Sequence, residues 1–181
     1  MVLARDGVIN EYGGECIRSP EEWHAIPGSL DAIARLNRAG YRVVVTTNQA
    51  GLRGKALDVE TLNLVHQRMQ QELAETGGRF EAIFICACLP DEDCPCYGPE
   101  PSMLHDIAAR LRTSLESVPM VAGTLRDMEA GLAVGARVCA VRTGPAFDDE
   151  TFAVPAGVEV HDSLSALAEV LIERGGGSGA G

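Results

Sequence analysis

Short apolar runs alternate with segments of helical periodicity along most of this chain. The almost continuously apolar runs lie at 1–3, 41–45, 82–85, 119–122, 138–141 and 158–160. Runs of this kind are typical of strands in a parallel sheet that is covered on both faces. The alternation therefore predicts an α/β fold with a doubly wound, Rossmann-like parallel sheet.

Helical stripes fill most of the intervals between these runs. Apolar residues recur at helical spacing over 29–39, 58–73, 104–111, 124–133 and 164–171. Asp58 is expected to cap the second of these helices. A chain of 181 residues is long enough for one well-buried domain. We therefore predict a single domain over 1–174 and a flexible glycine-rich tail over 175–181.

Polar or glycine-rich turns follow three of the predicted strands. They lie at 5–7 (Arg-Asp-Gly), 46–48 (Thr-Thr-Asn) and 123–124 (Gly-Thr). In an open parallel sheet, ligands bind outside the carboxyl ends of the strands. We therefore expect these turns to lie close together and to form a binding site.

Four of the six cysteines fall within eleven residues. Two C-x-C pairs in one short loop are formed by Cys86, Cys88, Cys94 and Cys96. Four thiolates at this spacing suit a structural zinc ion with no open coordination position. Free thiols and disulfides are the alternatives. The other two cysteines, Cys16 and Cys139, are expected to be ordinary buried thiols.

The net charge of the chain is −11, which argues against nucleic acid and anionic membranes as partners. No apolar run reaches the roughly 18 residues that a membrane-spanning helix needs. The N-terminus shows no pattern of a secretory signal peptide. We therefore expect a cytoplasmic protein, and a monomer. Lys55 is the only lysine, so a site that needs a lysine has few candidates.

Four segments of the chain follow one another in a specific order: 5–10 (RDGVIN), 47–51 (TNQAG), the cysteine loop as far as Pro101, and 125–128 (LRDM). In order and spacing they resemble the haloacid-dehalogenase-type phosphatases, and more closely the heptose bisphosphate phosphatases and their histidinol-phosphate phosphatase relatives. The resemblance implies the fold predicted above without a large cap domain. It also implies magnesium-dependent hydrolysis of sugar phosphate monoesters in lipopolysaccharide heptose synthesis, and a similar zinc loop.

In the resembling family, an aspartate after the first strand attacks phosphorus, and a second aspartate two residues later acts as general acid and base. A threonine and a lysine hold the phosphoryl oxygens, and magnesium offsets the repulsion between anions. The resemblance makes Asp6 the general acid/base and Asp127 a weak magnesium candidate. The expected contacts to phosphate or substrate are Thr47, Asn48, Gln49, Arg53 and Arg18.

Three positions depart from this pattern. The nucleophile position is Ala4, the family's arginine-lysine pair is replaced by Tyr97 and Gly98, and the magnesium aspartate falls on Gly123. Loss of one member of a coupled catalytic set costs about a millionfold in rate. Two interpretations follow: a heptose bisphosphate phosphatase-family protein with impaired catalysis, or a non-catalytic pseudophosphatase that binds a small sugar phosphate or acts as a scaffold. A third, in which Asp6 activates water directly, requires a metal.

Overall fold

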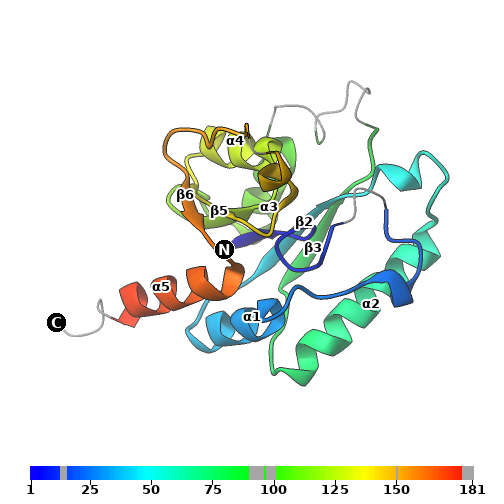
Figure 1. The fold of residues 1–181 in the computed structure, drawn as a ribbon, viewed down its shortest axis with the longest axis horizontal. Helices are drawn as coiled ribbons and strands as arrows, with labels where there is room; N and C mark the ends of the chain where they lie inside the picture. Colours follow the sequence, from blue (N-terminus) through cyan, green and yellow to red (C-terminus); the bar gives the residue numbers. More distant parts are fainter. Residues whose placement is uncertain (13–15, 90–95, 97–100, 150, 177–181) are drawn as a thin grey trace.

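Helices cover both faces of a parallel sheet in this protein (Figure 1). The computed structural model describes residues 1–12, 16–89, 96, 101–149 and 151–176. The N-terminus lies at the centre of the sheet, because the first strand is one of its two middle strands.

Within the described residues, six strands form one sheet in the order β3-β2-β1-β4-β5-β6, and all neighbours are parallel. The strands are β1 (Val2–Ala4), β2 (Val44–Asn48), β3 (Ala82–Cys86), β4 (Pro119–Ala122), β5 (Arg137–Val141) and β6 (Glu159–His161). The chain moves outward from β1 to β3 and then returns to the other side of β1 with β4. Ligands bind in open sheets at such a reversal of strand order.

Some of the helices begin at a side-chain cap, and others begin without one. The helices are α1 (Ser29–Arg38), α2 (Val59–Glu75), α3 (Ser102–Leu111), α4 (Leu125–Ala133) and α5 (Leu164–Gly176), with short 3-10 turns η1 (Pro20–Glu22), η2 (Ala50–Leu52) and η3 (Pro145–Asp148). The carboxylate of Asp58 accepts a hydrogen bond from the Thr61 amide at 2.7 Å, so the predicted cap of α2 is confirmed. Thr124 and Asp127 form a reciprocal capping box at the start of α4.

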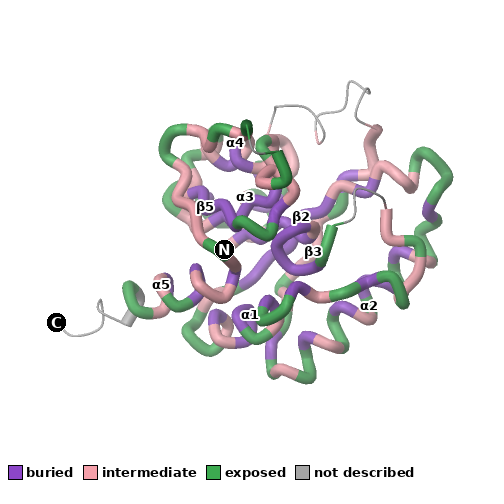
Figure 2. The backbone as a smooth tube through the Cα atoms, in the orientation of Figure 1, coloured by how far each residue is buried: buried purple, intermediate pink, exposed green. Residues whose placement is uncertain are grey.

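Successive strand residues face opposite helical layers. Leu3 and Val121 belong to a buried cluster with residues of α1, α2 and α5, whereas Val2 and Met120 pack with residues of α3. Met128 of α4 lies on that second face, against the end of β4 and the middle of β5. Figure 2 shows the buried residues along the strands and the inner sides of the helices. The predicted doubly wound sheet is therefore confirmed.

Several boundaries differ from the sequence prediction by a few residues, among them the start of the second strand and the end of the last helix. The second strand begins at Val44 rather than at Tyr41. Its register pairs Val44 with Val2, so the residues before Val43 extend beyond the start of β1. At the other end of the chain, α5 continues to Gly176, and the rest of the predicted tail, 177–181, lies outside the described residues.

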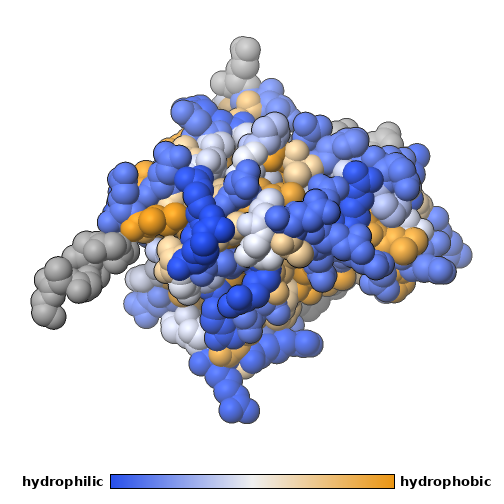
Figure 3. Space-filling model, turned by 90° about the horizontal axis from the view of Figure 1, so that it is seen from below, coloured by the Kyte–Doolittle hydropathy of each residue, from blue (hydrophilic) through white to orange (hydrophobic). Residues whose placement is uncertain are grey.

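No helix in the described part of the chain is long and apolar enough to cross a membrane. Hydrophilic residues cover most of the face in Figure 3. Large apolar side chains that are exposed include Val59 at the start of α2, Ile85 in β3 and Leu125 in α4.

Candidate functional site

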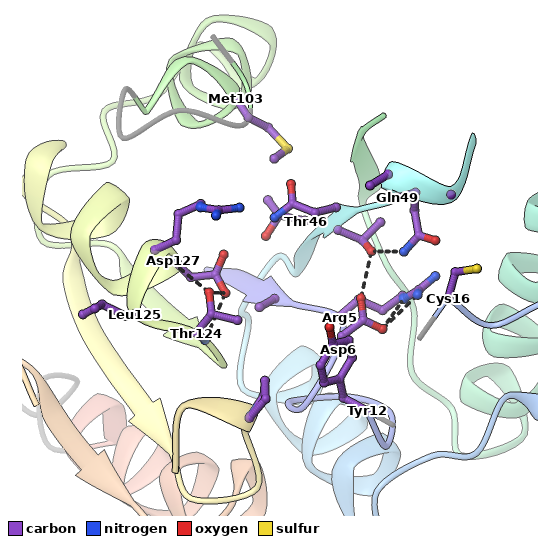
Figure 4. Close-up of a pocket in the computed structure, with 17 residues that line it drawn as sticks. Arg5, Asp6, Tyr12, Cys16, Thr46, Gln49, Met103, Thr124, Leu125 and Asp127 are labelled. Atoms are coloured by element: carbon purple, nitrogen blue, oxygen red, sulfur yellow. Dashed lines mark hydrogen bonds and ion pairs between the residues drawn. The ribbon is translucent and has the colours of Figure 1, made fainter. Parts of the chain in front are cut away.

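A cavity of about 590 Å³ opens at the carboxyl ends of β1 and β2 and at the start of α4, where the strand order reverses (Figure 4). The turns that the sequence predicted to meet there supply Asp6, Thr47 and Thr124 to its lining. The lining also includes Ala4, Arg5, Cys16, Asn48, Gln49, Arg126 and Asp127. Arg126 and Cys16 were not predicted at the site, and Cys16 is only partly buried, contrary to the expectation of a buried thiol.

Asp6, the expected acid/base, accepts hydrogen bonds on both carboxylate oxygens. Its Oδ1 accepts from Nε and Nη2 of Arg5, at 3.0 and 2.8 Å, and from Nδ2 of Asn10 at 3.1 Å. Its Oδ2 accepts from the Thr47 hydroxyl at 3.2 Å. Both oxygens of Asp6 are therefore already engaged by donors from three other side chains. Proton donation by Asp6 would require at least one of these bonds to break.

Thr47, the expected phosphate-binding residue, is already bonded on both sides. Its hydroxyl accepts from Nε2 of Gln49 at 2.8 Å and donates to Asp6. A hydroxyl has a single proton, so Thr47 can donate to a ligand only by turning away from Asp6. Two acceptor atoms beside it, Oε1 of Gln49 and Oδ1 of Asn48, are buried without a hydrogen-bond partner among the described residues.

Beneath the cavity, Arg5 connects Asp6 to a histidine that the sequence did not single out. The guanidinium is almost fully buried, and its Nη1 lies 3.3 Å from Nε2 of His66 in α2. Because the guanidinium can only donate, Nε2 of His66 must be the acceptor, and the ring is neutral. Burial, followed by the charge of Arg5, lowers the pKa of His66 from 6.5 to about 4. His66 is 6% exposed, so the imidazole is buried with its partner.

Asp127 reaches the cavity from the first turn of α4. Its Oδ2 accepts from the hydroxyl and the amide of Thr124, at 2.7 and 3.2 Å. Burial raises the pKa of the Asp127 carboxyl, and the charge of Asp6 adds to that effect, while the hydrogen bonds from Thr124 oppose it. Asp127 therefore has a structural partner in its own helix, and its second oxygen is the one left to meet a ligand.

Ala4 and Gly123, the positions of the missing carboxylates, lie at the same edge of the sheet. Ala4 is the last residue of β1 and is 5% exposed. Gly123 follows β4, and a Cβ atom built on it would lie 2.7 Å from the backbone oxygen of Asp6. A Cβ on Gly144 would in turn lie 2.6 Å from the backbone oxygen of Gly123. Glycine thus lets the loops after β1, β4 and β5 pack backbone against backbone.

The predicted basic contacts lie elsewhere. Arg53 is exposed just after η2 and is absent from the described lining of the main cavity. Arg18 and Lys55 line a second, more open cavity of about 440 Å³, together with Asp58 at the start of α2. The structure therefore brings Asp6, Thr47, Asn48, Gln49 and Asp127 together, and leaves Arg18 and Arg53 outside.

Three of the four clustered cysteines converge after β3. The sulfur atoms of Cys86, Cys88 and Cys96 all lie within 4.8 Å of one another. Cys86 and Cys96 are joined as a disulfide, and the Cys88 sulfur lies 3.4 Å from that of Cys96. Cys94, Tyr97 and Gly98 lie outside the described residues. The cluster adjoins the site, because the amide of Gln49 donates to the Cys86 carbonyl at 2.6 Å.

Nearly the whole chain is similar in sequence to known proteins. Residues 96–167 match a family model described as HAD-hydrolase-like. The D-glycero-beta-D-manno-heptose-1,7-bisphosphate 7-phosphatase of Bordetella bronchiseptica is 43% identical over 177 residues, which cover 96% of this chain and 98% of that protein. The protein of the same name from Pseudomonas putida is 42% identical and covers 95% of this chain, with 98% of its own length aligned.

Solved structures show the same relationship. A D,D-heptose 1,7-bisphosphate phosphatase from B. bronchiseptica, complexed with magnesium and phosphate, superimposes with a TM-score of 0.92 at 42% identity, covering 96% of this chain and 98% of that one. The corresponding phosphatase from Burkholderia thailandensis superimposes with a TM-score of 0.74 at 42% identity, covering 94% of this chain and 96% of that one. Sequence identity and structural similarity to these phosphatases therefore both extend over almost the full length of this chain.

Proposed function

The chain belongs to the D-glycero-β-D-manno-heptose-1,7-bisphosphate 7-phosphatase family, and on that premise we propose that it binds a sugar phosphate in the cavity at β1 and β2 without hydrolysing it at a measurable rate. The observation that carries the proposal is Ala4, which ends β1 where the family chemistry needs a nucleophilic carboxylate. A methyl group cannot form an acyl phosphate.

The remaining carboxylates do not replace the missing nucleophile. Asp6 is held by Arg5, Asn10 and Thr47. Asp127 is held by Thr124. Direct attack by water would need one of these carboxylates to take a proton from it, which competes with the hydrogen bonds that hold it. The loss of rate expected when one member of a coupled set is missing is about a millionfold.

Magnesium, which the B. bronchiseptica structure contains, does not fit the residues present here. Mg²⁺ demands near-ideal octahedral coordination by oxygen atoms. Ala4 and Gly123 offer no side-chain oxygen, and a Cβ on Gly123 would already collide with the backbone oxygen of Asp6. The proposed function is therefore ligand binding without a magnesium-dependent reaction.

The ligand class follows from the polar atoms of the cavity. The buried acceptors Oδ1 of Asn48 and Oε1 of Gln49 lack donors among the described residues, and the hydroxyl groups of a sugar are donors. Arg126 adds a guanidinium to a lining that also holds the carboxylates of Asp6 and Asp127, and a guanidinium suits a phosphate group. The cavity, at about 590 Å³, falls within the usual size of small-molecule sites.

The cysteine loop supports a structural zinc ion as part of the same proposal. Three sulfur atoms already converge, and the fourth cysteine of the pattern, Cys94, follows in the same loop. Cys86 and Cys96 are zinc ligands only as thiolates, so zinc binding would require that their disulfide be reduced first, for example by an added thiol reductant. Bound to four thiolates, zinc would fasten the loop beside Gln49 and leave no coordination position for water. The metal content of protein purified without chelator tests this assignment.

The decisive experiment measures phosphate release from heptose bisphosphate in the presence of magnesium. The B. bronchiseptica relative, assayed in parallel, serves as the positive control. We expect no release by this chain above the rate without protein. Magnesium-dependent release that scales with the concentration of this chain would refute the proposal.

Binding is measured separately by calorimetric titration with the same sugar phosphate. Asn48→Ala should weaken the affinity about fivefold to tenfold, because it removes an acceptor worth about 1 kcal/mol. Asn63→Ala, at an exposed position of α2, is the matched control and should change nothing. Heat of binding that is absent, or equal for both variants, would contradict ligand binding at this cavity.

A further inference from the structure

A second group of metal-binding side chains lies at the opposite end of the sheet, on β5 and β6. The Cys139 sulfur, a carboxylate oxygen of Glu159 and a ring nitrogen of His161 all lie within 4.8 Å of one another. The parallel register places Cys139 beside Glu159, and His161 beside the residue two positions after Cys139. The three side chains therefore share one face of two paired strands. We propose that they bind a thiophilic divalent cation such as Zn²⁺.

His161 supplies the observation that points to a ligand. Its Nε2 atom is buried and has no hydrogen-bond partner among the described residues. The nearest acidic atom, Oε2 of Glu159, lies 3.7 Å away, which is too far for a hydrogen bond. Buried polar atoms are normally satisfied. A cation between the sulfur, the carboxylate and this nitrogen would satisfy it.

The carboxylate of Glu159 is held in place by arginines from two elements. Nε and Nη2 of Arg137 donate to its two oxygens, each at 2.9 Å, and Nη1 of Arg174 in α5 lies 3.5 Å from Oε2. Hydrogen bonds to a carboxylate fix its orientation, as they do in metal sites. The same two positive charges oppose a cation, so the site should bind more weakly than a four-thiolate loop.

The sulfur, carboxylate and imidazole donors determine which metal ions the site prefers. A thiolate with an imidazole favours zinc or cobalt over magnesium or calcium, and three protein ligands leave a fourth position for water. As the sulfur–metal bond forms, the Cys139 S–H bond breaks and its proton passes to solvent. Bound there, the metal would fasten the three-residue edge strand β6 to β5.

The test counts zinc per chain by elemental analysis after equilibration with zinc and removal of the excess. Cys139→Ser and His161→Gln should each lose one ion per chain relative to the unmodified protein. Cys16→Ser and the exposed His105→Gln are matched controls and should lose none. The test compares the zinc content of each variant with that of the unmodified protein, so it does not depend on whether the loop at Cys86 also holds zinc. It is also independent of the proposed function.

His161→Gln keeps the test valid if Cys139→Ser fails to fold, because Cys139 lies in the core and His161 does not. Zinc should also raise the melting temperature of the unmodified protein more than that of His161→Gln. Equal zinc content in His161→Gln and in the unmodified protein would overturn the proposal.

Discussion

Acidification should destabilise this protein through His66, and the structure gives the size of the effect. The ring accepts from Arg5 at 3.3 Å, and the two side chains are 6% and 1% exposed. Protonation would place a second positive charge against a buried guanidinium. In the folded chain the pKa of His66 is therefore lowered to about 4, mainly by burial, whereas the unfolded chain has the ordinary 6.5.

Whether stability rises or falls with pH depends on which state, folded or unfolded, binds more protons. Between pH 6.5 and about 4, the unfolded chain is protonated at His66 and the folded chain is not. Stability is therefore complete above pH 6.5 and falls with a limiting slope of about 1.4 kcal/mol per pH unit as the pH decreases. By about pH 5 the loss is about 2 kcal/mol, and below the folded pKa it levels off at about 3 kcal/mol.

Urea unfolding followed by circular dichroism, at a series of pH values from about 7.5 to about 5, measures this loss. His66→Gln is the matched variant, because its amide oxygen can accept from Arg5 but does not titrate. Carboxylates elsewhere contribute equally to both proteins. We expect the free energy of unfolding of the unmodified protein to fall about 2 kcal/mol further than that of His66→Gln by about pH 5. Parallel pH profiles would refute the assignment of a neutral, buried His66.

Two further predictions concern the loops around the site. Gly123→Asp should destabilise the protein by about 1–3 kcal/mol, because its Cβ would lie 2.7 Å from the backbone oxygen of Asp6. Gly54→Asp is the control, since the nearest atom to its Cβ is 3.5 Å away, and it should leave thermal unfolding almost unchanged. Equal destabilisation by the two substitutions would contradict the packing argument. Cys88→Ser should lower the zinc content by one ion per chain and lower the melting temperature; unchanged metal content would show that the loop holds no zinc.

The strand and helix order could be predicted from the sequence because it depends on local periodicity. Leu62, Val65, Met69 and Leu73 repeat at helical spacing, and all are buried on one side of α2. The start of β2 was predicted three residues early, since apolar character continues before Val44 while the pairing with β1 does not. Periodicity marks which residues can be buried, but the register with the neighbouring strand decides where a strand begins.

The contacts inside the site could not be predicted, because they join residues that are distant in sequence. Arg5 and His66 are 61 positions apart, and nothing near His66 marks it as the partner of a buried arginine. The cluster at Cys139 likewise exists only because β6 adds to the sheet beside β5 in a particular register. Short-range motifs located Asp6, Thr47 and Asp127, whereas the partners that fix those side chains come from the tertiary fold.

The packing at Gly123 changes how the missing carboxylates should be understood. From the sequence alone, Ala4, Gly98 and Gly123 are losses from one coupled set, and three substitutions made together would be needed to reverse them. In the structure, Gly123 is in close backbone contact with Asp6 and Gly144, and a side chain at this position requires the loops to move apart. Ala4 ends β1 only two residues before Asp6, so the loop that would receive a restored carboxylate is the same loop that Gly123 contacts. An aspartate at position 4 therefore cannot recover a metal site by itself, because the backbone that would complete it is held in the closer packing that glycine permits.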